Sequence, residues 1–229
     1  MKKKILSMMI SICAANVLCA SSLYTIQNGK LFKVVEDSTS STGYRIDNDT
    51  TPVKKTDILL ISKLDNSIAF GEGAKASGWN SLAVGYNANA REFNATALGS
   101  YTIANNNAVA IGPDAQALGG SSVAIGLDSK TNGADTIAIG TNAQALKNDA
   151  IAIGQNSKAT SDHDVAFGIG ANASGGWSQA IGTSAESKGS HSNAIGFTAK
   201  ASGKNALAFG NEAEAQKDNS ISFGFKAQA

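Results

Sequence analysis

Twelve glycines recur along this chain at an almost constant spacing, and each closes the same short phrase of sequence. The phrase reads IAFG at 68–71 and ISFG at 221–224, and the spacing is 14 residues except for 13 between Gly99 and Gly112. The glycines are Gly71, Gly85, Gly99, Gly112, Gly126, Gly140, Gly154, Gly168, Gly182, Gly196, Gly210 and Gly224. A fixed period of this kind predicts a solenoid, in which each repeat packs against its neighbours.

Each repeat contains two short segments with the alternation of β-strands. With the glycine as position 0, position −1 is a large aliphatic residue or Phe, position −3 is usually apolar, and positions +3 and +5 are small. Position −2 is Ala in every repeat but the last, where it is Ser222. Gly at 0 and often at +7, with Asn or Asp at −5, favours bends between the strands. We therefore expect an all-β solenoid of about twelve stacked coils.

The alternation also predicts which side chains face inward. We expect the large residues at −3 and −1 to face the interior, opposite the small residues at +3 and +5. The alanine at −2 would then point outward, and an outward position that stays small and apolar is typical of a covered surface. This reasoning predicts a homo-oligomer with three-fold closure, in which Ala124, Ala138 and Ala152 lie on the contact face.

The N-terminus predicts export. Three lysines at 2–4 precede a mostly apolar stretch at 5–18 that is too short to span a bilayer, which indicates a signal peptide over residues 1–20. A lipoprotein at Cys19 is a weaker alternative, because Leu18 stands where a small residue is required. Both cysteines, Cys13 and Cys19, lie in this segment, so we expect no disulfide afterwards. Later apolar runs are too short to insert directly in a membrane.

Residues 21–65 do not repeat. Two β-prone runs flank Asn28-Gly29, which predicts a hairpin, and residues 37–52 are typical of a linker. The apolar run Ile58–Ile61 is interpreted as a cap on the first coil. The repeats then occupy residues 66–229.

The repeat phrases resemble one known family. NAVAIG at 107–112, SSVAIG at 121–126 and DAIAIG at 149–154 are similar to the head repeats of YadA-like trimeric autotransporter adhesins. The resemblance covers residues 66–229. It implies a left-handed parallel β-roll that trimerises on the bacterial outer membrane or is secreted. It also implies a virulence function, in which the head binds host matrix proteins or cell-surface molecules, or promotes autoaggregation.

Two alternatives stay open. Family members continue into a coiled-coil stalk and a membrane anchor, whereas this sequence stops at Ala229, so a truncated, released or partner-anchored head is one expectation. A structural surface spacer without a ligand is the other. The net charge of +1 gives no electrostatic case for binding nucleic acid. We predict no enzymatic activity and no cofactor, because no catalytic constellation can be assigned.

Four residues are candidates for ligand contact. Trp79 and Trp177 fall at predicted bends, where exposed aromatic rings can anchor a partner protein or can instead shield the next coil. His163 and His191 both occupy position −5, two repeats apart, which is too far for one metal ion to bind both. We therefore predict no metal site.

Overall fold

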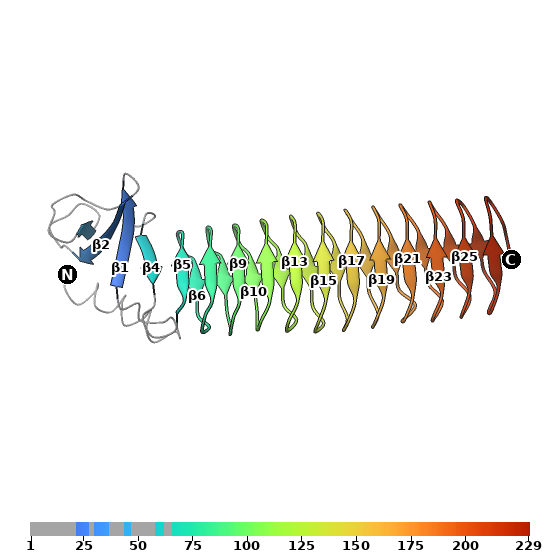
Figure 1. The fold of residues 1–229 in the computed structure, drawn as a ribbon, viewed down its shortest axis with the longest axis horizontal. Coiled ribbons are helices and arrows are strands. Elements are labelled where there is room, and N and C mark those ends of the chain that lie inside the picture. The colour runs from blue at the N-terminus through green and yellow to red at the C-terminus, as the bar shows by residue number, and fades with distance from the viewer. Residues whose placement is uncertain (1–21, 28–29, 37–43, 47–57, 62–65) are drawn as a thin grey trace. The chain divides into compact units, whose positions relative to one another are not determined.

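A computed structural model describes residues 22–27, 30–36, 44–46, 58–61 and 66–229, and every regular element in these ranges is a β-strand. The signal peptide predicted for residues 1–20 lies outside the described residues, as does the turn predicted at Asn28-Gly29. The chain divides into an N-terminal unit, 1–107, and a C-terminal unit, 108–229. Both contain stacked coils (Figure 1).

The N-terminal unit begins with antiparallel strands. They are β1 (Ser22–Gln27), β2 (Lys30–Glu36), β3 (Tyr44–Ile46) and β4 (Ile58–Ile61). Strand β1 pairs with both β2 and β4, and β2 also pairs with β3. The pairing of β1 with β2 is the one that the Asn28-Gly29 hairpin requires. Strand β4 pairs with the first strand of the first coil, Leu60 opposite Ala69, so it lies along the edge where a cap was expected.

The coils of the N-terminal unit pair in parallel. Their strands are β5 (Ile68–Phe70), β6 (Lys75–Ala76), β7 (Leu82–Val84), β8 (Asn89–Ala90), β9 (Thr96–Leu98) and β10 (Ile103–Ala104). Three-residue strands pair with three-residue strands, and two-residue strands with two-residue strands. Each coil therefore contributes one strand to each of two sheets.

The C-terminal unit repeats the same coil. Its three-residue strands are β11 (Val109–Ile111), β13 (Val123–Ile125), β15 (Ile137–Ile139), β17 (Ile151–Ile153), β19 (Val165–Phe167), β21 (Gln179–Ile181), β23 (Asn193–Ile195), β25 (Leu207–Phe209) and β27 (Ile221–Phe223). Its two-residue strands are β12 (Gln116–Ala117), β14 (Lys130–Thr131), β16 (Gln144–Ala145), β18 (Lys158–Ala159), β20 (Asn172–Ala173), β22 (Glu186–Ser187), β24 (Lys200–Ala201) and β26 (Glu214–Ala215). We call the two sets the long-strand sheet and the short-strand sheet.

Within each unit, the register of both sheets follows the repeat without slippage. In the long-strand sheet Ala138 lies opposite Ala152, and in the short-strand sheet Ala145 lies opposite Ala159. Hydrogen bonds run from coil to coil, for example from the amide of Gly154 to the carbonyl of Ile139 at 2.8 Å. The fold is thus the parallel β-solenoid that the 14-residue period predicts.

The interior of the coil corrects the predicted facing of the long strands. Ala124, Ala138 and Ala152 have no exposed surface in the single chain, so the assignment of these residues to an intermolecular contact face was wrong. Large residues at −1 and −3 instead lie on the outer face, where Ile139 is 36% and Phe167 is 52% exposed. The inside is lined by positions −4, −2, +3 and +5, and its buried apolar residues are all alanines.

The size of the coil explains this arrangement. Strands of three and two residues joined by two tight turns bring the two sheets so close that Thr102, Thr131, Thr136 and Asp164 are the largest side chains fully buried among the described residues. An Ile or Phe would not fit, since interiors are already close-packed and overpacking is destabilising. Large apolar side chains are therefore excluded from the core by space, despite their hydrophobicity.

The turns contain the Gly at position 0 and the Asn or Asp at position −5 that the repeat predicted for bends. All twelve phrase-closing glycines have φ between 119° and 138°. At Gly140 a Cβ atom would lie 2.7 Å from the carbonyl oxygen of Gly154 in the next coil, so a side chain has no room there. Position −5 is left-handed in every coil, with φ between 50° and 60°, a conformation that Asn and Asp tolerate best.

Candidate assembly and binding surfaces

The outer face of the long-strand sheet is predominantly apolar in the C-terminal unit. We call it the apolar stripe and define it as positions −3 and −1 of the odd-numbered strands from β11 to β27. Position −1 is Ile or Phe in every one of these strands. Phe209 and Phe223 stack with ring centroids 5.0 Å apart and an interplanar angle of 4°, and Phe223 is 73% exposed. Exposed apolar surfaces of this extent are typical of sites where another molecule binds.

Two polar residues interrupt this stripe. Gln179 in β21 and Asn193 in β23 occupy position −3, directly opposite each other in register, between Val165 and Leu207. Gln179 is exposed and Asn193 is half-buried. Within the described part of the chain, neither side-chain amide has a hydrogen-bond partner. The stripe therefore carries two unpaired amides in two adjacent coils.

One edge of the C-terminal unit carries a column of rings. Position −5 of successive coils is Asp149, His163, Trp177 and His191, which we call the edge column. The Nε2 atom of His163 lies 3.4 Å from Oδ2 of Asp149. The ring of Trp177 stacks on His163 at 3.8 Å and faces His191 at 6.1 Å. Three of the four predicted contact residues therefore meet in one column, and Trp177 remains 57% exposed.

Trp79, the fourth candidate, lies in the N-terminal unit. Its ring is 57% exposed and lies 6.1 Å from the ring of Phe93 in the following coil. Tyr86 and Tyr101, which follow the long strands at positions +1 and +2, form a separate edge-to-face pair at 5.3 Å. The exposed rings of Trp79 and Phe93 form a second surface with the composition that protein partners favour.

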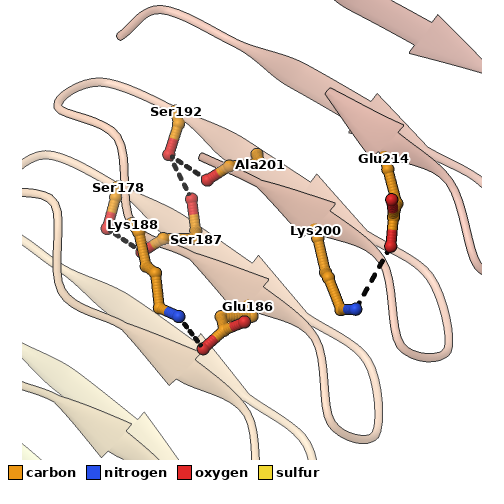
Figure 2. Close-up of polar contacts among 8 residues, drawn as sticks. All are labelled: Ser178, Glu186, Ser187, Lys188, Ser192, Lys200, Ala201 and Glu214. Atoms are coloured by element: carbon orange, nitrogen blue, oxygen red, sulfur yellow. Dashed lines mark hydrogen bonds and ion pairs between the residues drawn. The ribbon is translucent and has the colours of Figure 1, made fainter. Parts of the chain in front are cut away.

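The outer face of the short-strand sheet is polar. Lys188 pairs with Glu186 at 2.6 Å, and Lys200 pairs with Glu214 of the next coil at 3.1 Å (Figure 2). The hydrogen bond from Lys200 lowers the pKa of the Glu214 carboxyl, and a hydrogen bond from Gln216 acts in the same direction. Mixed charges of this kind are typical of a solvated face.

A small polar network lies inside the coils behind this face. The carboxylate of Asp164 is fully buried and accepts hydrogen bonds from the amides of Ser161 and Ser178, at 2.8 and 3.0 Å, and from the hydroxyl of Ser178 at 2.8 Å. Further along, the hydroxyls of Ser187 and Ser192 lie 2.6 Å apart (Figure 2). Because these groups point inward and satisfy one another, they hold coils together and do not form a reactive site.

The described residues contain no group of three or more His, Cys, Asp or Glu side chains that could hold a metal ion. Trp177 stands between the two histidines of the edge column, so His163 and His191 do not converge on one point. No helix in the described ranges is long and apolar enough to cross a bilayer.

Sequence reasoning missed the apolar stripe and the stacking of the rings in the edge column. The apolar stripe was assigned to the core because hydrophobicity was weighed without the width of the coil. The ring stacking in the edge column follows from three aromatic residues at one repeat position, and aligning all position −5 residues would have revealed it.

Comparison with known proteins identifies the repeats. A family model described as the YadA head domain repeat, in two copies, matches residues 65–88, 80–104, 104–129, 132–157, 187–213 and 201–227. Together these ranges cover more than half of the chain. A search of curated proteins found no match to the chain.

Proposed function

Because the chain belongs to the YadA head-repeat family, we propose that it is the binding head of a bacterial surface adhesin. The family implies an adhesin-like, non-enzymatic function at the cell surface or in secreted form. We assign to this chain attachment to host extracellular matrix proteins or cell-surface molecules, together with autoaggregation. The observation that supports the proposal most directly is the repeated coil, which presents similar surfaces many times along one chain and so suits avidity from weak contacts.

We further propose that the head is a homotrimer assembled through the apolar stripe. The stripe is apolar at every −1 position of the C-terminal unit, and nothing within the described chain covers it. Three-fold closure would bring three copies of the same surface together and remove their apolar side chains from water. This assignment replaces the alanine face expected from the sequence.

In this arrangement the polar short-strand sheet and the edges remain available to ligands. Among them, the edge column and the rings around Trp79 are the proposed contact sites, because exposed tryptophan contributes more to binding than most residue types. Lys and Glu pairs on the intervening surface would favour solubility more than affinity.

Assembly is tested with Ile139→Lys in the full chain. Ile139 is 36% exposed, so lysine can be accommodated by an isolated coil, whereas three lysines would meet in the trimer. We expect a trimer for the parent chain and a folded monomer for the variant by light scattering and circular dichroism. Leu127→Lys is the matched control, since Leu127 is 45% exposed but lies outside the stripe, and it should stay trimeric.

Adhesion is tested by binding of these proteins to surfaces coated with collagen, fibronectin or laminin and to host cells. We expect the parent and Leu127→Lys to bind, Ile139→Lys to lose avidity, and Trp177→Ala or Trp79→Ala to bind more weakly while remaining trimeric. A parent trimer that neither binds any of these surfaces nor self-associates would contradict the adhesin proposal and favour a structural spacer.

A further inference from the structure

We propose that Gln179 and Asn193 fix the axial register of the three chains, so that each coil lies level with the same coil of its partners. The inference rests on the proposed homotrimer and adds to it the residues that decide how the chains align. It concerns the C-terminal unit alone.

A periodic interface does not define its own register. Successive coils are separated by about 4.8 Å, the distance between neighbouring strands in a sheet. A chain that slides by one coil along its partner again places Ile or Phe at −1 and an aliphatic residue at −3 against similar residues. Since burial of apolar surface is non-directional, the apolar part of the stripe distinguishes such arrangements poorly.

The two amides break this periodicity in two adjacent coils. From β11 to β27, position −3 is aliphatic except at Gln179 and Asn193. An amide side chain carries both donors and an acceptor, so it can pair with copies of itself. With the chains level, the three Gln179 amides meet in one coil layer and the three Asn193 amides in the next, where they can satisfy one another. Their lack of partners within the described chain leaves both free for this role.

A slide by one coil removes half of the contacts between amides of neighbouring chains. Gln179 of one chain would meet Asn193 of its partner, but the remaining Gln179 would meet Val165 and the remaining Asn193 would meet Leu207. A slide by two coils leaves no amide level with another. An amide enclosed by aliphatic side chains without a partner is strongly disfavoured. A single polar residue fixes register in coiled coils for the same reason, at some cost in stability.

The test compares the parent stripe with Gln179→Leu/Asn193→Leu, which makes position −3 aliphatic throughout. The matched control, Gln144→Leu/Asn172→Leu, makes the same chemical change on the short-strand sheet. All chains carry Cys13→Ser and Cys19→Ser. Register is measured by the disulfides that form between two chain types refolded together. One type carries Ile151→Cys/Ile153→Cys. The other carries a tag and Val165→Cys/Phe167→Cys, which lie in the next coil.

Disulfides between chains of the same type report level coils, and disulfides between the two types report a slide by one coil. For the parent and the control we expect mixed-type disulfides at no more than about a tenth of the same-type yield. For Gln179→Leu/Asn193→Leu we expect an unchanged trimer mass, a higher melting temperature and at least a fivefold rise in mixed-type disulfides.

Three results would overturn the inference in distinguishable ways. A stable trimer of the double Leu variant with an unchanged disulfide pattern shows that other features set the register. A parent trimer whose mixed-type yield already equals its same-type yield shows that no register is fixed. A parent chain that is monomeric by light scattering removes the proposed trimer itself, and the inference with it.

Discussion

Replacing Gly140 by Ala tests the close approach of neighbouring coils. Gly140 has φ of 128°, and an added Cβ would lie 2.7 Å from both the carbonyl carbon and the oxygen of Gly154. The backbone conformation costs about 1–3 kcal/mol for a residue with a side chain. The steric overlap adds about 1–3 kcal/mol, as overpacking does in other cores. We therefore expect Gly140→Ala to lower the free energy of unfolding by about 2–6 kcal/mol.

Gly176→Ala provides the matched control. Gly176 also has a left-handed φ, of 75°, but an added Cβ would meet nothing within 4 Å. Its expected cost is therefore the backbone term alone, about 1–2 kcal/mol. The difference between the two variants contains the contact between coils and the difference in backbone cost between φ of 128° and φ of 75°.

The assay is urea unfolding followed by circular dichroism at one fixed protein concentration, because assembly would contribute to stability. Hydrogen exchange at the amide of Gly154, which donates to the carbonyl of Ile139 at 2.8 Å, measures local opening if coils unfold separately. Gly140→Ala should unfold at lower urea than Gly176→Ala and exchange faster at this amide. Equal midpoints and equal exchange for the two variants would refute the reasoning.

Three further changes test the interior and the short-strand sheet. Ala152→Leu should lower the free energy of unfolding by about 1–3 kcal/mol in urea titrations, because the coil has no space for the added atoms. Asp164→Ala should cost about 3 kcal/mol in the same assay, since it leaves the buried amide of Ser178 without its acceptor and removes the nearer of two acceptors of the Ser178 hydroxyl. Lys200→Ala should raise the pKa of Glu214 in an NMR titration. The lowered pKa stabilises the folded chain above the ordinary glutamate pKa, and this contribution is lost as the pH falls through the lowered value.

The period and the strands could be predicted because both depend on local sequence patterns. A glycine every 14 residues and alternation around it define where strands begin and end, and the strands β1 and β2 follow from β-prone runs on either side of Asn28-Gly29. These features depend on backbone conformation and on short-range patterns.

Alternation alone could not predict which side chains of the long strands point to the interior, because the pattern is the same for either orientation. Ala152 and Ile153 alternate equally well in both orientations, and the choice depends on the distance between the sheets. That distance is a property of the closed coil, because short strands and tight turns set it together. The buried hydrogen bonds of Asp164 were not predicted for a related reason. The turn places Ser161 beside it, and the stacking of coils places Ser178 beside it.

Because the core contains little more than methyl groups and small hydroxyls, whole coils could be added to or removed from such a chain. Every coil offers its neighbour the same narrow cross-section, so duplication or loss of a whole 14-residue segment would leave the remaining coils in place. An insertion of one residue within a strand would instead reverse the inner and outer side chains beyond it. The whole coil is therefore the unit by which a solenoid of this kind can lengthen or shorten without disturbing its core.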